Sequence, residues 1–190
     1  MRLVLASSSP RRAELLRAAD FKFDIVSPAI DERTRPGELP EDYVLRLASE
    51  KSAAAQSSAP TQDALVLGAD TAVVVDAEIL GKPEDDADVA RMLRQLSGRA
   101  HQVMTGVSVR HSTREIREVV TTTVWFATLT PPEIDWYVAS GEGRDKAGAY
   151  AIQGRAARFI PRVDGSYSNV VGLPIALVYA LISKLSSKLI

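Results

Sequence analysis

The chain begins with a segment, residues 2–6, that is apolar after Arg2 and is followed at once by the signal for the start of a helix. An apolar run of this kind predicts a buried strand. Ser9 suits the N-cap position, and Pro10 suits the first helical position, where its missing N–H is not needed. We expect the helix to continue to about Ala19, with Ala19 on its inner side. This part of the chain therefore predicts a strand, a hydroxyl-rich turn and a helix.

The turn between this strand and this helix has the features of a phosphate site. Residues 7–9, including Ser8, are serines, and Arg11 and Arg12 lie in the first helical turn. The free N–H groups and the positive end of the helix dipole point toward the turn and suit an anion. Arginine is unfavourable at a helix N-terminus unless an anion is bound, and its guanidinium pairs well with phosphate. An ordinary capped helix with two solvated arginines is the alternative.

The remaining segments alternate between strand patterns and helix patterns. Strands are expected over residues 21–26, 64–67, 72–75, 79–80, 102–110, 116–128 and 157–163, with a turn over 164–169. Helices are expected to begin at residues 40, 85, 131 and 173 and to end near residues 51, 96, 141 and 188. This order predicts an α/β or α+β class, with a mixed sheet flanked by helices and folded into two lobes around a central cleft.

Composition excludes several classes of protein. A length of 190 residues fits one domain or two small lobes, and a net charge of −1 gives no global field for nucleic acid or a membrane surface. The chain has no cysteine, which excludes disulfides and thiolate metal sites and fits a reducing, cytoplasmic location. The most apolar stretch, residues 170–182, is shorter than the roughly 20 residues of a membrane span and predicts a buried helix. No signal peptide is expected.

Asp70 is a candidate catalytic residue. It follows an apolar run and lies between Gly68 and Thr71, where we expect the strand to break. A carboxylate at the end of a strand is well placed for a ligand in a crevice. It could bind a hard divalent cation or take a proton from water. The alternative is an aspartate that bonds to its own backbone in a turn.

Asp31 and Glu32 form a pair of acids on a polar, proline-rich loop, residues 28–40. Such a pair on a solvated loop is usually part of the surface. Mg²⁺, however, accepts one or two carboxylates together with phosphate oxygens and water. Glu32 together with Asp70 would supply two carboxylates.

Three lysines and a glutamine complete the candidate site. Lys51 lies near the expected end of a helix, where a solvated lysine is the simpler interpretation. Lys82 lies in a Gly-Lys-Pro turn, and Lys146 lies in a glycine-rich loop where the backbone could approach a ligand closely. Gln153 offers a donor and an acceptor, which is enough to recognise the edge of a base.

Several known kinds of site are absent from the sequence. The two histidines, His101 and His111, have no partner at metal-ligand spacing. The chain contains no P-loop, no dinucleotide-binding fingerprint after a strand and no nucleophile elbow.

Taken together, these segments resemble the Maf family of nucleoside triphosphate pyrophosphatases. The matching motifs follow the family order over nearly the whole chain, at residues 5–12, 67–71, 81–83, 97–98, 101–105, 145–154 and 166–174. The resemblance implies one Maf-like domain over residues 1–190, with an elongated mixed sheet similar to that of the inosine triphosphate pyrophosphatases. It also implies a cytoplasmic homodimer.

The resemblance further implies hydrolysis of pyrimidine nucleoside triphosphates, dTTP and UTP, to a monophosphate and pyrophosphate with Mg²⁺ or Mn²⁺. It assigns Asp70 as proton acceptor and connects Arg12, Thr71 and Gln153 with substrate choice. The stretch over residues 146–153 resembles the branch that cleaves dTTP and UTP. The branch that cleaves 7-methyl-GTP has glutamate at the position of Gln153.

The expected mechanism is attack of water on the α-phosphorus, with Asp70 as base and with Glu32 and Asp70 as metal ligands. The triphosphate would be neutralised by the cations and the turn at the start of the first helix, namely Ser8, Arg11, Arg12, Lys51 and Lys82. A non-catalytic nucleotide-binding regulator of septum formation is the alternative from another class. A kinase-like phosphotransferase is a second alternative, against which the missing P-loop argues.

Overall fold

The computed structural model describes residues 2–58 and 64–186. The chain divides into two compact units. Three of the boundaries between them fall within strands β3, β5 and β6, and the fourth lies between residues 171 and 172. Unit 1 comprises residues 1–71, 105–120 and 172–190, and unit 2 comprises residues 72–104 and 121–171. Within the described residues, no helix combines the length and the apolar character that crossing a membrane requires.

The described residues form a seven-stranded mixed sheet in the order β2-β1-β3-β5-β6-β7, with β4 paired to β3. β1 runs parallel to β2 and β3, whereas the β3–β4 and β6–β7 pairs are antiparallel. The predicted mixed sheet is therefore confirmed. Its strands are β1 (Leu3–Ala6), β2 (Phe23–Val26), β3 (Leu65–Val75), β4 (Glu78–Leu80), β5 (Ala100–His111), β6 (Arg114–Trp125) and β7 (Arg162–Asp164).

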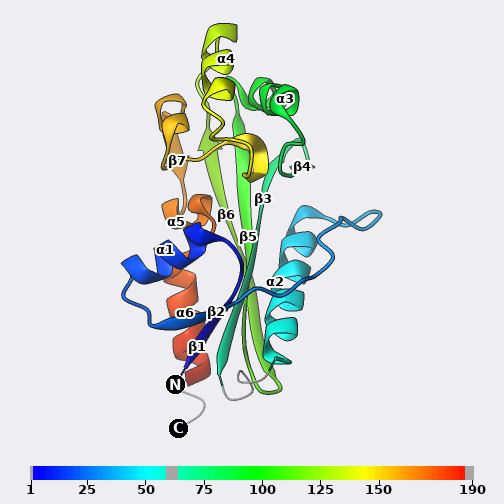
Figure 1. The fold of residues 1–190 in the computed structure, drawn as a ribbon, viewed down its shortest axis with the longest axis vertical. Coiled ribbons are helices and arrows are strands. Elements are labelled where there is room, and N and C mark those ends of the chain that lie inside the picture. Colours follow the sequence, from blue (N-terminus) through cyan, green and yellow to red (C-terminus); the bar gives the residue numbers. More distant parts are fainter. Residues whose placement is uncertain (1, 59–63, 187–190) are drawn as a thin grey trace. The chain divides into compact units, whose positions relative to one another are not determined.

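In unit 1, helices cover both faces of the strands (Figure 1). Leu3 and Leu5 of β1 pack in one apolar cluster with residues of α1 (Pro10–Ala18) and α6 (Ile175–Ser186). Val4 and Ala6 pack in a second cluster with Ala55 of α2 (Pro40–Gln56). Alternate residues of a strand point to opposite faces. Residues 3–6 are continuously apolar because helices bury both faces of β1.

Unit 2 has its own apolar core, built by two helices against the strands. The core joins residues of α3 (Asp86–Leu96) and α4 (Pro131–Ala139) with residues from β3, β4, β5 and β6. Phe159 of the 3₁₀-helix η2 (Arg155–Phe159) and Tyr150 also belong to it. Two further short helices are η1 (Ala147–Ala149) and α5 (Tyr167–Val171).

The predicted break in the strand at Gly68 is wrong, because β3 runs without interruption from Leu65 to Val75. The presence of glycine at position 68 has another explanation. A Cβ atom at Gly68 would lie 2.1 Å from the carbonyl oxygen of Ala48 and 2.8 Å from the nitrogen of Ser52, both in α2. The glycine therefore allows close packing of α2 on the strand, and Asp70 lies in the middle of β3 rather than at its end.

Other predicted boundaries also change. Residues 157–163 form the end of η2 and the start of β7 rather than one strand, and the predicted turn at 164–169 leads into α5. Residues 170–182 belong to two helices rather than one, because α5 ends at Val171 and α6 begins at Ile175. Ala19 is exposed and does not face inward. The strand predicted at 21–26 begins later, at Phe23. The strand predicted at 116–128 ends earlier, at Trp125. The predicted end of the last helix, near residue 188, lies outside the described residues.

Candidate active site

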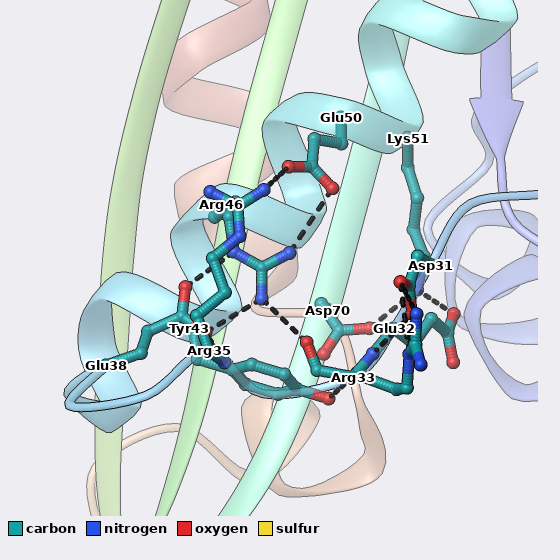
Figure 2. A network of polar contacts seen from close by, with 10 residues as sticks. All are labelled: Asp31, Glu32, Arg33, Arg35, Glu38, Tyr43, Arg46, Glu50, Lys51 and Asp70. Atoms are coloured by element: carbon teal, nitrogen blue, oxygen red, sulfur yellow. Dashed lines mark hydrogen bonds and ion pairs between the residues drawn. The ribbon is translucent and has the colours of Figure 1, made fainter.

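Lys51 lies at the centre of an ionic cluster in unit 1. Its Nζ atom donates to Asp70 Oδ1 at 2.6 Å and lies 2.7 Å from Glu32 Oε1. The side chains of Lys51 and Asp70 are 10% and 12% exposed, whereas that of Glu32 is 53% exposed. One ammonium group therefore holds a carboxylate from a loop and a carboxylate from a strand at the same point (Figure 2).

The burial of Lys51 overturns the interpretation of this residue as a solvated lysine at a helix end. α2 continues to Gln56, so the lysine lies inside the helix. Its position follows the helical spacing of the apolar face, and this spacing is a signal that could have identified it. The buried residues of α2 are Val44, Leu47, Ala48, Lys51, Ser52 and Ala55.

The neighbouring acids Asp31 and Glu32 have different partners. The Asp31 carboxylate accepts hydrogen bonds from Arg33, at 2.9 Å from Nε and 2.7 Å from Nη2. These bonds from the guanidinium lower the pKa of Asp31 to about 2. Asp31 is thus engaged within its own loop, and Glu32 is the acid that reaches Lys51.

Two carboxylates of the cluster could take part in binding a divalent cation. No group of three or more His, Cys, Asp or Glu side chains suited to a metal occurs among the described residues. Glu32 and Asp70 do converge on one positive charge. Mg²⁺ binds through one or two carboxylates and completes its shell with phosphate oxygens and water. The two acids fit such an ion, provided that a phosphate ligand supplies further oxygen atoms.

Arg12 connects three parts of unit 1. Its Nε donates to the carbonyl oxygen of Gly172 at 2.9 Å, its Nη1 to Ser7 Oγ at 3.1 Å and its Nη2 to Thr71 Oγ1 at 3.2 Å. The residue is 8% exposed. Burial lowers the pKa of the Arg12 guanidinium from its ordinary value, and the Asp70 carboxylate opposes that shift. The interpretation of Arg12 as a solvated arginine is therefore wrong.

The turn before α1 has the predicted N-cap residue but a different bonding pattern. Ser9 occupies the N-cap position, yet its described side chain makes no capping hydrogen bond. Instead, the Ser9 N–H donates to Ser7 Oγ at 3.2 Å. Ser8 is exposed and Arg11 is half-buried. The helix start thus leaves Ser8 exposed to solvent.

Lys82, Lys146 and Gln153 all belong to unit 2. The Gly148 N–H donates to the Gly81 carbonyl oxygen at 3.0 Å, so the Gly-Lys-Pro turn lies beside η1. Lys146 Nζ donates to the main-chain oxygen of Glu142 at 2.7 Å. Lys82 and Gln153 are exposed. Two of the predicted lysines therefore come from adjacent segments of one unit.

Glu142 and Tyr137 hold the turn that carries Gln153. The Glu142 carboxylate accepts the Arg155 N–H at 2.9 and 3.0 Å and the Tyr137 hydroxyl at 3.0 Å. The Ala151 N–H in turn donates to the Tyr137 oxygen at 3.3 Å. Burial raises the pKa of Tyr137, and the Glu142 charge adds to this effect. The main chain is thus fixed on both sides of Gln153.

Comparison with known proteins decides the family. The family model described as Maf-like protein matches residues 2–185. This chain belongs to the Maf family. It is 53% identical over 191 residues to a dTTP/UTP pyrophosphatase of Shewanella oneidensis, covering 97% of this chain and 98% of the relative. A dTTP/UTP pyrophosphatase of Vibrio parahaemolyticus is 54% identical over 173 residues, with 91% of each chain covered.

A solved structure supports the fold of this Maf chain. The Staphylococcus aureus Ham1 protein matches with a TM-score of 0.54 and covers 97% of this chain and 99% of its own. The identity is 17%, so this likeness concerns the fold alone. The resemblance drawn from the sequence motifs and the predicted fold class are both confirmed.

Several side chains that were not singled out in the sequence contact the candidate residues or their loops. Thr105 Oγ1 lies 2.9 Å from Thr71 Oγ1, beside Arg12. Tyr137 and Glu142 lie outside the predicted site. So do Tyr43 and Arg46 of α2, which donate to main-chain oxygen atoms of the loop that carries Glu32. Most of these side chains bond to main-chain atoms of distant loops. Such contacts leave no local pattern in a sequence.

Buried His101 makes the stability of unit 2 sensitive to acid. Its Nε2 lies 2.8 Å from the Tyr150 hydroxyl, and burial lowers the pKa of His101 to about 4. The unfolded chain takes up this proton near pH 6.5, so the folded state binds fewer protons between pH 6.5 and 4. We expect stability to fall as the pH drops through this window, by about 2 kcal/mol at pH 5.

Urea unfolding at several pH values measures this effect, with His101→Gln as the comparison. The variant should be less stable at pH 8, because the ring contacts with Phe126 and Tyr150 are lost. Its stability should depend less on pH between 6.5 and 4. An equally steep decline in the variant would assign the acid sensitivity to other groups.

Proposed function

We propose that this Maf chain hydrolyses dTTP and UTP to the nucleoside monophosphates and pyrophosphate. Relatives that are about half identical over nearly their full length are named dTTP/UTP pyrophosphatases. The observation that carries the chemical proposal is the convergence of Asp70 and Glu32 on Lys51. A buried carboxylate, a buried ammonium group and an accessible carboxylate together suit water attack on a phosphate.

Asp70 is the proposed base. Lys51 holds Oδ1 of Asp70 at 2.6 Å, and we assign the other carboxylate oxygen to the attacking water. The water oxygen forms a bond to the α-phosphorus while its proton passes to Asp70. The bond from the α-phosphorus to the bridging oxygen breaks, and pyrophosphate leaves. Glu32 and Asp70 would hold Mg²⁺ or Mn²⁺, which when bound supplies positive charge to the phosphate oxygens.

The remaining site residues have proposed binding roles. The side chains that bind or neutralise the triphosphate are Ser8, Arg11, Arg12, Lys51, Lys82 and Lys146. Thr71 and Gln153 are proposed to act in substrate choice. Because phosphoryl transfer depends mainly on positioning and charge stabilisation, these residues account for much of the expected rate.

A product assay tests this function against its alternatives. With UTP and Mg²⁺, the proposal requires UMP and pyrophosphate in equal amounts. Orthophosphate without pyrophosphate would indicate a different phosphotransfer. Binding of UTP without any product would favour a non-catalytic nucleotide-binding regulator of septum formation.

Gln153 gives the test of base selection. Gln153→Glu removes the amide donor, so we expect the rates with dTTP and UTP to fall about tenfold or more relative to the rate with GTP. The measurement is kcat/KM for each nucleotide. The half-buried Gln95 of α3, whose amide donates to Glu78, provides a Gln95→Glu control. Unchanged relative rates in Gln153→Glu would remove Gln153 from base recognition.

The wider role proposed for the chain is removal of unwanted nucleotides from the cytoplasmic pool. A homodimer in the cytoplasm is part of this proposal. Size-exclusion chromatography with light scattering measures the oligomeric state.

A further inference from the structure

The loop that carries Glu32 is held to α2 by side chains that do not reach Asp70 or Lys51. We propose that Tyr43 and Arg46 are positioning residues that place Glu32 against Lys51 by fixing the main chain of this loop. The inference rests on the proposed role of Glu32 in the reaction. It assigns a function to a network that the reaction scheme above does not use.

The first attachment is at Glu32 itself. The Tyr43 hydroxyl donates to the main-chain oxygen of Glu32 at 3.0 Å. Next along the loop, Arg46 Nη2 donates to the main-chain oxygen of Arg33 at 3.1 Å. Two consecutive peptide groups are therefore held by two side chains of one helix, as Figure 2 shows.

The third attachment uses Glu38 as an intermediate. Arg46 Nε donates to Glu38 Oε1 at 2.5 Å, and Arg46 Nη2 donates to Oε2 at 2.8 Å. Glu38 Oε2 also accepts the Arg35 N–H at 3.0 Å. The side chains of Arg46 and Glu38 are 12% and 9% exposed, so this forked pair is shielded from solvent. Bidentate arginine–carboxylate pairs fix geometry as well as charge.

The anchoring residues form one side of α2. Tyr43, Arg46 and Glu50 follow each other at intervals of three and four residues, and Arg46 Nη1 lies 3.3 Å from Glu50 Oε2. The Arg46 guanidinium lies 5.6 Å from the centre of the Tyr43 ring, which supports both side chains. Lys51 follows Glu50 directly in the same helix. The helix that carries the ammonium group therefore also determines where the loop carboxylate lies.

The exposure of Glu32 explains why such anchoring matters. Its side chain is 53% exposed, so packing contributes little to its orientation. An exposed carboxylate on an unanchored loop would sample many positions. Restricting it to the one position that the reaction needs would cost conformational entropy. Misplacement of a reacting or ligating group by about 1 Å can cost about a hundredfold in rate. Main-chain anchoring keeps Glu32 within reach of Lys51.

Tyr43→Phe is the sharpest test, because it removes a hydroxyl and keeps the ring. We expect kcat/KM for UTP to fall about tenfold, with faster hydrogen–deuterium exchange in residues 28–39 and little change in Tm. The control is Tyr179→Phe, since Tyr179 is 64% exposed on α6. Arg46→Lys, which keeps the charge but lacks the fork, should act in the same direction.

A double variant separates positioning from a general structural effect. If Tyr43 acts through Glu32, Tyr43→Phe should reduce activity no further in a Glu32→Gln background. Independent losses that multiply in the double variant would overturn the inference. So would wild-type activity in Tyr43→Phe and Arg46→Lys when Glu32→Gln is impaired.

Failure of the underlying function would have a different signature. Wild-type activity in Glu32→Gln would overturn the proposed role of Glu32, and with it the inference. Wild-type protein that releases no pyrophosphate from UTP would overturn the proposed function itself. If Arg46→Lys fails to fold, Arg46→Met combined with Glu38→Gln removes both charges of the pair and replaces it in the same measurements.

Discussion

Replacing Asp70 by asparagine should reduce UTP turnover at least about a hundredfold, the scale on which loss of a general base is felt. The amide has nearly the same shape as the carboxylate, and its oxygen can still accept the hydrogen bond from Lys51. The variant therefore removes the proton acceptor and one negative charge while keeping the shape of the cluster. The measurement is the initial rate of pyrophosphate release at saturating UTP and Mg²⁺.

The control for this change is a carboxylate of similar chemistry away from the cluster. Asp164 of β7 has a side chain that is 68% exposed and lies 3.6 Å from Arg162. Asp164→Asn should keep wild-type turnover. Circular dichroism and thermal unfolding show whether Asp70→Asn is folded. A folded Asp70→Asn variant with turnover within a few-fold of wild type would reject Asp70 as the base.

Local chemistry predicts the helix starts of this fold well. Pro10, Pro40 and Pro131 each occupy the beginning of a helix, where the sequence placed them. The interruption of the strand expected at Gly68 was wrong, because the glycine is required by a tertiary contact and not by a turn. The close approach of α2 demands a glycine there, and a glycine in a continuous strand looks locally like a turn.

The same distinction applies to the candidate site. The serine turn, Asp70 and the Glu32 loop were named as candidates from composition and spacing, although the strand end expected at Asp70 was wrong. Lys51 could not be assigned in that way, because its partners come from a loop and a strand elsewhere in the chain. Its helical spacing did place it on the apolar face of α2, and a lysine on such a face needs a charged partner.

Arg46 and Tyr43 show what lies beyond sequence reasoning. Both hold main-chain oxygen atoms of a loop without regular structure. Main-chain acceptors are present at every residue, so no pattern of side chains predicts which of them will accept a hydrogen bond from a distant side chain. The family resemblance supplied the chemistry of the site, whereas the groups that position it became visible only in three dimensions.

Replacing Lys51 by methionine should both abolish most activity and destabilise the chain. Methionine matches the length of the buried stem but leaves the Asp70 carboxylate without its cation. Removing one partner of a buried pair costs about 3 kcal/mol or more, because the other charge remains desolvated. Urea unfolding at pH 7 measures this loss, and pyrophosphate release measures the loss of turnover.

The direction in which a second substitution changes the stability distinguishes this mechanism from simple loss of packing. Adding Asp70→Asn to Lys51→Met removes the stranded charge, so the double variant should regain much of the stability, although it should remain inactive. Lys184, whose side chain is 62% exposed and lies 3.9 Å from Glu118, supplies the control. Lys184→Met should cost less than about 1 kcal/mol, as expected for an exposed pair. If the double variant is instead less stable than Lys51→Met, the cost of Lys51→Met does not come from the unpaired charge of Asp70.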